Sequence, residues 1–221
     1  MLIALFAALV QASAGPAPEA TPDAAALAEM RAVSVSRVFP YWEDYLEMDE
    51  AERDRFTLLY EVRGPGDAAL WLETAEGGTR LLAPDENGVV AAPDLAAFDR
   101  DAQIRVDAPP GAMSVSMVMA PLLEPTLSYE ADALRVAAGQ ANAAMRRIAG
   151  VAALFAPRMD AVLFVFDGPA PDAWAISPDG ERRALPVEQN RVWFPVRERA
   201  FRGTERVEFG AEPVRLILTA R

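Results

Sequence analysis

Residues 56–72 read FTLLYEVRGPGDAALWL, and this stretch holds the pattern that decides the fold. An apolar run over residues 56–62 ends at the turn Gly64-Pro65-Gly66-Asp67, and a second run follows over residues 69–72. Further short apolar runs bounded by turn residues occupy residues 80–83, 89–92, 103–107 and 113–119. Short strands at regular spacing, separated by Gly, Pro and Asn turns, predict a β-sandwich or barrel.

The second half of the chain repeats this pattern at a constant offset of 103 residues. The offset aligns Asn87 with Asn190 and Ile104 with Val207. Because one offset holds from residue 87 to residue 115, we expect an internal duplication of roughly sixty residues. A unit of that size leaves an open sheet with an apolar face, so two units are expected to cover each other. The alternative is a pair of independent small domains.

A long helix is predicted between the two repeats. Apolar residues recur with a strict 4-3-4-3 spacing from Leu127 to Met159, with Ser128 as the expected N-cap and Pro157 as the stop. Gly150 offers a point at which this helix can divide in two. Four of the ten residues of the apolar stripe are alanine, which favours a helix packed closely against a sheet over a dimer seam.

These patterns define the predicted fold class as mainly β with one central helix (α+β), in which two β-rich repeats form a pseudo-symmetric sandwich. The predicted order is a signal peptide at residues 1–14, an N-terminal spacer with short helices at 15–54, repeat 1 at 55–120, a connecting helix at 121–160 and repeat 2 at 161–221. Within the N-terminal segment, a short helix is expected over residues 23–32 and a strand over residues 33–38.

The first residues, MLIALFAALVQASAG, resemble an export signal. The apolar run over residues 2–10 is too short to span a bilayer, and Ala12-Ser13-Ala14 fits a cleavage site. No arginine precedes the run, and an ordinary buried helix is the alternative. We therefore expect a periplasmic or secreted protein cleaved after Ala14, with no transmembrane span in the mature chain.

The composition excludes several kinds of catalytic site. The chain has no Cys, no His and no Lys, and all 21 basic residues are arginine. This removes Ser-His-Asp and Cys-His nucleophile systems, zinc sites built on imidazole or thiolate, and lysine Schiff bases. No cofactor is expected. A net charge of −12 also disfavours nucleic acids and anionic lipids as partners.

An aromatic segment stands just before the first repeat, where residues 39–46 read FPYWEDYL. Tyr41, Trp42 and Tyr45 are the candidate contacts to a partner or ligand, because aromatic rings supply contact area at low entropic cost. The alternative is that Trp42, Tyr45 and Leu46 form one helical face that caps the sandwich.

An acidic run overlaps this segment. Residues 43–55 hold seven acids against two arginines. The run suits a docking face for a basic partner, although a solvated surface is the commoner meaning of such a run.

Two further patterns allow metal binding. Met113, Met117 and Met119 are soft donors suited to Cu(I), but on a strand they share one face and favour core packing. The turns at residues 85–88 and 177–180 carry oxygens that calcium accepts, but both are primarily hairpin turns. We therefore predict no metal site.

A resemblance adds to this interpretation. Asp54-Arg55-Phe56 before a strand, Ala149-Gly150 and Ala156-Pro157-Arg158 resemble small exported proteobacterial proteins classed as a domain of unknown function. The resemblance covers the chain from about Tyr41 onward. It implies export and a sheet-helix-sheet order, and it transfers no active residue.

The predicted function is a non-enzymatic exported binding module for an envelope protein, polymer or lipid-like ligand. The main alternative is a carboxylate-dependent hydrolase of envelope polysaccharide, which needs two facing acids in a cleft. A weaker alternative is a homo-oligomer held together by the alanine-rich stripe.

Overall fold

A computed structural model describes residues 22–65, 69–74, 78–85, 87–98, 102–150 and 158–220, so the predicted signal peptide lies outside the described residues. The chain is 37% strand and 24% helix. The predicted class, mainly β with antiparallel sheets and one long helix, is confirmed.

Most predicted strands are present within a few residues of their expected bounds. The N-terminal part contains α1 (Ala24–Glu29), β1 (Arg31–Ser34), α2 (Val35–Val38), α3 (Trp42–Leu46), η1 (Glu50–Glu52), β2 (Phe56–Arg63), β3 (Ala69–Glu73), β4 (Thr79–Leu81), β5 (Val89–Val90), η2 (Leu95–Phe98), β6 (Gln103–Asp107) and β7 (Ser114–Pro121). The C-terminal part contains β8 (Ser128–Glu130), α4 (Ala131–Ala149), β9 (Ala161–Val165), β10 (Ala173–Ile176), β11 (Arg182–Ala184), β12 (Val187–Glu188), β13 (Arg191–Pro195), η4 (Arg199–Phe201), β14 (Arg206–Phe209) and β15 (Arg215–Thr219).

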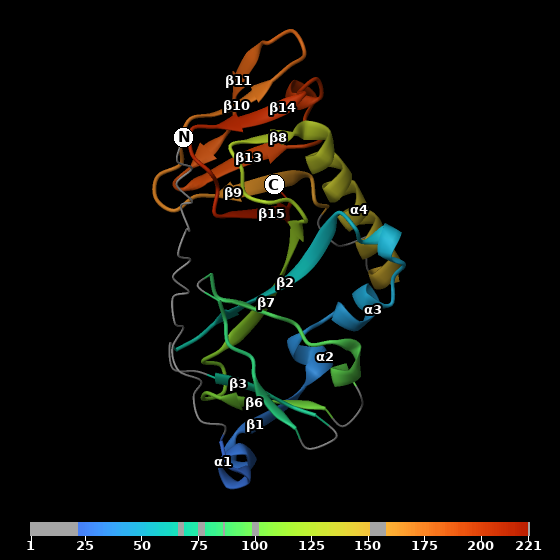
Figure 1. Cartoon of the computed structure of the whole chain (residues 1–221), viewed down its shortest axis with the longest axis vertical. Coiled ribbons are helices and arrows are strands. Elements are labelled where there is room, and N and C mark those ends of the chain that lie inside the picture. The colour runs from blue at the N-terminus through green and yellow to red at the C-terminus, as the bar shows by residue number, and fades with distance from the viewer. Residues whose placement is uncertain are drawn as a thin grey trace, which may run out of the picture.

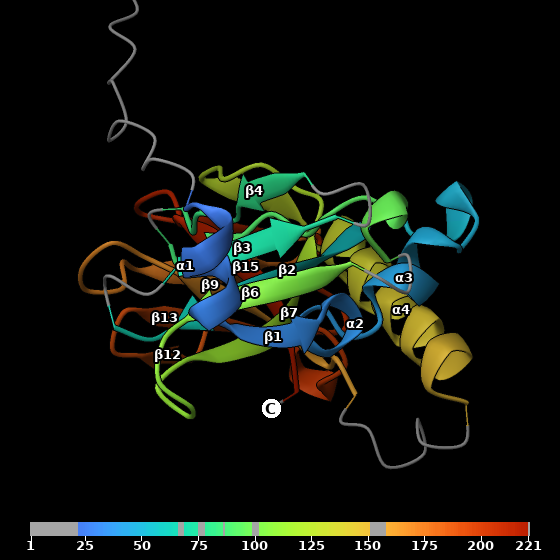
Figure 2. The same cartoon turned by 90° about the horizontal axis from the view of Figure 1, so that it is seen from below.

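The described strands form three antiparallel sheets. A seven-stranded sheet has the order β12-β13-β9-β15-β7-β2-β5, and two four-stranded sheets have the orders β1-β6-β3-β4 and β11-β10-β14-β8. Figure 1 shows the two smaller sheets at opposite ends of the molecule, with the large sheet between them and α4 along one side. Figure 2, seen from below, shows β1, β3 and β6 stacked over β2 and β7.

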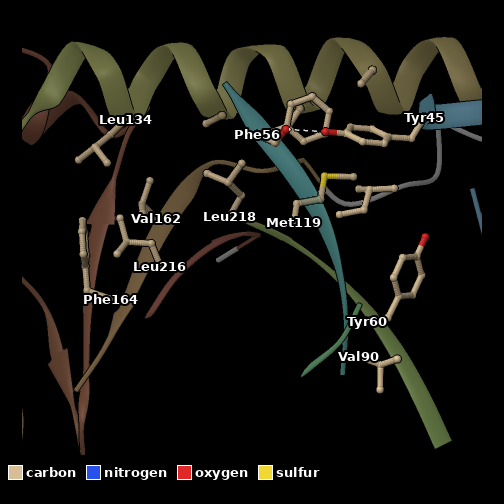
Figure 3. Packing of buried hydrophobic residues seen from close by; sticks show 14 of the residues in the cluster. Tyr45, Phe56, Tyr60, Val90, Met119, Leu134, Val162, Phe164, Leu216 and Leu218 are labelled. Atoms are coloured by element: carbon tan, nitrogen blue, oxygen red, sulfur yellow. Dashed lines mark hydrogen bonds between the residues drawn. The ribbon is translucent and has the colours of Figure 1, made fainter. Parts of the chain in front are cut away.

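The core is one continuous cluster that runs from sheet to sheet beneath α4. Alternate residues of β2 (Phe56, Leu58 and Tyr60) point into it, as the two-residue period of a strand requires. In Figure 3, Phe164 and Val162 lie to one side of the cluster and Tyr60 to the other. The two halves of the large sheet meet where Leu218 of β15 pairs with Met119 of β7.

The long helix begins later than the sequence predicts. Ser128 lies in β8 and is not the N-cap, because its strand pairs with β14; Glu130 takes the cap position without a side-chain cap bond. Leu127 is 49% exposed and does not join the buried stripe. The helix ends at Gly150, whose φ of 52° suits glycine, and residues 151–157 lie outside the described part.

The alanine-rich stripe of α4 packs inside the molecule. Ala138 and Ala141 are 2% and 0% exposed. The helix contacts β2, β7 and β9 of the seven-stranded sheet and β8 and β14 of one four-stranded sheet. Small side chains let the helix backbone approach the sheets closely. This stripe is therefore a core face, and the interpretation of a dimer seam is wrong.

The N-terminal segment differs from the expected strand over residues 33–38. Residues 33 and 34 belong to β1, which begins at Arg31 and pairs with β6, but Val35–Val38 is helical. Val35, Val38 and Phe39 are all buried, a helical spacing that an alternating pattern conceals in so short a stretch. The predicted helix at 23–32 is present as α1, where the Asp23 carboxylate accepts from the Ala26 amide at 2.8 Å.

The segments predicted as a spacer (15–54) and as a connecting helix (121–160) each contribute a strand to a four-stranded sheet, β1 and β8 respectively. Among the described residues, no helix is both long enough and apolar enough to span a membrane.

Candidate functional site

The aromatic segment lies where α3 meets the loop that leads into η2. Tyr41 precedes α3 with a φ of 65°, a left-handed conformation that a bulky residue rarely adopts, and its side chain is 42% exposed. Trp42 is half-buried, and its indole nitrogen donates to the Pro93 carbonyl oxygen at 2.6 Å. Tyr41 and Trp42 therefore form an aromatic edge of the molecule, which the hydrogen bond from Trp42 to Pro93 holds in place.

Tyr45 does not belong to that exposed edge. Its ring is 4% exposed, stacks on Trp42 at 5.1 Å between ring centroids, and meets Phe56 edge-on. Its hydroxyl donates to the Phe56 carbonyl oxygen at 2.9 Å (Figure 3). Tyr45 is therefore a packing residue that caps the core, and a partner reaches it only if this part of the core opens.

Tyr60 supports the same segment from below. Its hydroxyl donates to the Pro40 carbonyl oxygen at 2.6 Å, and its ring meets Phe39 edge-on. Burial raises the pKa of the Tyr60 phenol well above its ordinary value, so the hydroxyl remains a donor at any physiological pH. The backbone just before Tyr41 is therefore fixed by a buried hydrogen bond.

The acidic run is fixed to α4. The Gln140 amide donates to the Ala51 carbonyl oxygen and the Asp54 carboxylate, and its oxygen accepts from the Arg55 amide. Two turns further along α4, Arg147 forms an ion pair with Glu52. Nothing in the sequence identifies Gln140 as an anchor, because its partners lie more than eighty residues away.

All seven acids of the run are exposed. Asp54 and Glu52 have ion-pair partners, but the others have none among the described residues. Arg53 does not neutralise them, since its guanidinium lies 5.3 Å from the Tyr45 ring centroid and donates to the Met48 carbonyl oxygen. We call the unpaired set the acidic surface: Glu43, Asp44, Glu47, Asp49 and Glu50.

The charge of the chain is concentrated in the same part of the molecule. Residues 1–120 carry 20 acids and 8 arginines, whereas residues 121–221 carry 13 of each. The whole net charge therefore belongs to the part of the chain that holds the acidic surface.

The metal alternatives do not lead to a site in the described residues. Met119 is buried, and Met113 and Met117 pack against the core, as the core interpretation predicts. Asp85 and Asp179 use their carboxylates within their own turns, accepting from the amides of Val89 and Glu181. Among the described residues, no three acidic side chains gather as metal ligands do.

The hydrolase alternative requires two carboxylates that face each other. Glu61 is the buried acid of the described residues, at 7% exposure. It lies 2.7 Å from Arg215 and 3.4 Å from Arg63. The charged groups that contact Glu61 in the described part of the chain are therefore cations, whereas a hydrolase of this kind needs a second carboxylate there.

Comparisons of this chain with protein-family models, with curated proteins and with solved structures found no match. The function must therefore be inferred from the chain's own geometry.

Proposed function

We propose that this chain is a non-enzymatic, exported interaction module that binds a basic segment of an envelope protein. The contact is made by the acidic surface together with the accessible parts of Tyr41 and Trp42. The observation that carries this proposal is that five exposed acids, without ion-pair partners in the described part of the chain, lie beside an exposed tyrosine. Hydrogen bonds to the rest of the fold hold this segment in place. Export rests on the N-terminal sequence pattern.

The geometry favours a cationic partner for two reasons. Unpaired carboxylates on one surface repel one another, and a guanidinium or ammonium group relieves that repulsion. The exposed ring of Tyr41 adds a π face that attracts the same cations. An anionic polymer or lipid headgroup would meet repulsion at this surface, so a basic protein segment fits best.

Rigidity makes the surface effective. Trp42 and Tyr60 anchor the backbone around Tyr41, and Gln140 holds the far end of the acidic run on α4. A surface that is already ordered loses little conformational entropy when a partner binds.

We also propose that the chain consists of two equivalent β-units that form a pseudo-symmetric pair of sandwiches. The order β1-β6-β3-β4 has the same connectivity as β8-β14-β10-β11, which supports the proposal. Further support comes from the offset of 103 residues, because β6 begins at Gln103 and β14 begins at Arg206. Each unit also has a hydrogen bond from a helix to a backbone carbonyl in or near a short 3-10 helix. Trp42 of α3 donates to Pro93, just before η2, and Arg135 of α4 donates to Phe201, at the end of η4.

Calorimetric titration with an arginine-rich peptide tests the binding function. The triple variant Glu43→Gln, Asp44→Asn, Glu47→Gln is expected to bind about tenfold more weakly, since each lost surface pair contributes about 0.2–1 kcal/mol. The matched control, Glu124→Gln, Asp172→Asn, Glu188→Gln, removes three exposed acids from the C-terminal part and is expected to bind as the parent does. Equal losses in both variants would mean that only net charge matters and would contradict a defined surface.

A further inference from the structure

The C-terminal part carries a basic depression beside the start of α4. It has a volume of about 540 Å³ and is lined by Asp132, Arg135, Val196, Arg197 and Arg202. Three arginines therefore face one acid, in a chain whose net charge is −12.

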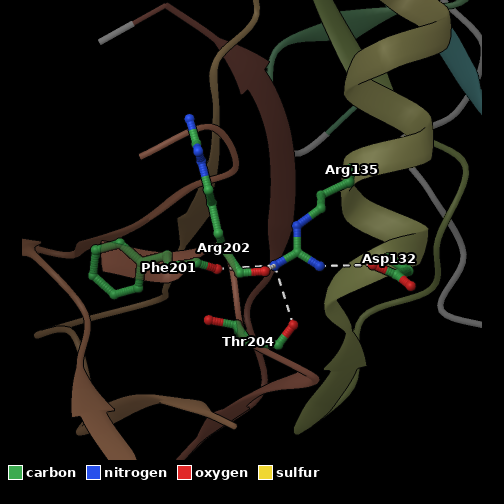
Figure 4. A network of polar contacts seen from close by, with 5 residues as sticks. All are labelled: Asp132, Arg135, Phe201, Arg202 and Thr204. Carbon is green, nitrogen blue, oxygen red and sulfur yellow. Dashed lines mark hydrogen bonds and ion pairs between the residues drawn. The ribbon is translucent and has the colours of Figure 1, made fainter. Parts of the chain in front are cut away.

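Arg135 forms a fixed wall of this depression. Its Nη2 donates to the carbonyl oxygens of Phe201, Arg202 and Thr204 at 2.9, 3.3 and 3.1 Å, and its Nη1 lies 2.6 Å from the Asp132 carboxylate (Figure 4). The guanidinium also lies over the Phe194 ring. Most donors of Arg135 are thus occupied, and Asp132 offsets its charge.

Arg197 and Arg202, in contrast to Arg135, leave their guanidinium groups open to a ligand. Both side chains are exposed, and neither guanidinium has a hydrogen bond or an ion pair with any other residue of the described part. Two guanidinium groups that line one depression repel each other unless an anion lies between them. The depression therefore holds two positive charges that form no ion pair within the described part of the chain.

The basic character is not a requirement of the fold. The positions 103 residues earlier in the chain, which the sequence offset aligns with Arg197 and Arg202, hold Asp94 and Asp99. The same local pattern therefore tolerates the opposite charge. The positive charge of Arg197 and Arg202 therefore belongs to this particular surface.

We propose that this depression binds a phosphoryl group through Arg197 and Arg202. A phosphate monoester carries a charge of about −1.5 to −2, which matches these two arginines better than a single carboxylate does. The planar forks of the two guanidinium groups donate paired hydrogen bonds to phosphate oxygens. The positive end of the α4 dipole lies on the same side and adds to the attraction.

The rest of a phosphorylated ligand has room beside this site. A second depression, of about 690 Å³, shares Arg197 and is lined by Asp160, Arg183, Pro186 and Glu198 among other residues. The Pro186 ring offers apolar contact for the body of an organic ligand, and Arg197 lines both depressions.

Calorimetric titrations with inorganic phosphate, glucose 6-phosphate and vesicles containing phosphatidic acid distinguish three sources of the group, and acetate serves as the carboxylate comparison. We expect binding of at least one phosphate probe, and a loss of roughly tenfold or more in Arg197→Gln, Arg202→Gln. The control Arg80→Gln, Arg191→Gln removes two exposed arginines elsewhere and is expected to keep the parent affinity.

Several outcomes would overturn the proposal. These are no binding of any phosphate probe at about 10 mM, acetate binding as strong as phosphate binding, or an equal loss in the control variant. Neutralising the acidic surface is expected to leave phosphate binding intact, so the failure of one proposed site is distinguishable from the failure of the other. Circular dichroism of each variant confirms that the fold is retained.

Discussion

The indole nitrogen of Trp42 lies 2.6 Å from the carbonyl oxygen of Pro93, fifty-one positions later in the chain. This hydrogen bond joins α3 to the loop that leads into η2. It fixes the orientation of the aromatic edge next to the acidic surface. The contact thus connects the core of the N-terminal part with its proposed binding surface.

Replacing Trp42 with Phe tests this link. The ring remains, so stacking on Tyr45 is largely kept, but the Pro93 carbonyl loses its donor. We expect the free energy of unfolding to fall by about 0.5–1.5 kcal/mol in urea titrations. Trp174→Phe is the control because the Trp174 indole nitrogen has no hydrogen bond in the described part, and a loss as large as that of Trp42→Phe would contradict the account.

The Tyr45 hydroxyl satisfies a backbone carbonyl at the start of β2. It donates to the buried Phe56 carbonyl oxygen at 2.9 Å. Tyr45→Phe is expected to cost about 1–3 kcal/mol because it leaves a buried carbonyl unpaired. Tyr45→Ala is expected to cost about 3–5 kcal/mol, as cavity-forming substitutions do. A Tyr45→Ala variant as stable as the parent would show that this ring is not part of the core.

Because the backbone of Tyr41 is strained, replacing this residue distinguishes its role in partner binding from its role in stability. Glycine adopts a φ of 65° without strain, and Tyr41 is exposed and lies outside the core cluster. Tyr41→Gly is therefore expected to keep the free energy of unfolding or raise it by up to about 1 kcal/mol. The same variant is expected to bind the arginine-rich peptide more weakly. Marked destabilisation together with unchanged binding would reverse both assignments.

The buried ion pair between Glu61 and Arg215 links β2 to β15 across β7. Although the two atoms lie 2.7 Å apart, their alignment is poor, and neither makes a regular hydrogen bond. Arg215→Leu is expected to cost about 3–5 kcal/mol because it leaves the buried Glu61 without its closest cation. The double variant Glu61→Leu, Arg215→Leu is expected to be more stable than Arg215→Leu alone. Additive losses in chemical denaturation would argue against this coupling.

The turn at Asp179 has a pH dependence of known sign. The Ser177 hydroxyl, and then the Glu181 amide, hold the pKa of the Asp179 carboxyl below its ordinary value. A carboxyl with a lowered folded-state pKa stabilises the fold above its ordinary pKa, and this contribution is lost as the pH falls through the folded value. Ser177→Ala is expected to raise the pKa of Asp179 toward the ordinary value in an NMR titration. An unchanged pKa would show that the hydroxyl is not its main cause.

Strands such as β2, β3 and β6 were predictable because each is short, apolar and bounded by turn residues. Strands β1 and β8 were not, because they lie in segments predicted as a spacer and a helix. The cap role of Tyr45 was predictable as an alternative, because its helical spacing from Trp42 places both rings on one face. The start of α4 was not predictable, since Ser128 suits a helix cap locally and only its pairing with β14 makes it a strand residue. Gln140 and Arg135 were also inaccessible from sequence, because their partners are distant in the chain and carry no motif.

Chemical-shift mapping of the isotope-labelled chain with the arginine-rich peptide tests the central claim most directly. The account predicts that perturbed amides concentrate in residues 41–54 and in the neighbouring loop at residues 93–95. The phosphate-binding depression around Arg197 is expected to be unperturbed. Perturbations spread evenly over the surface, or confined to the C-terminal part, would contradict the assignment of the acidic surface as the binding site.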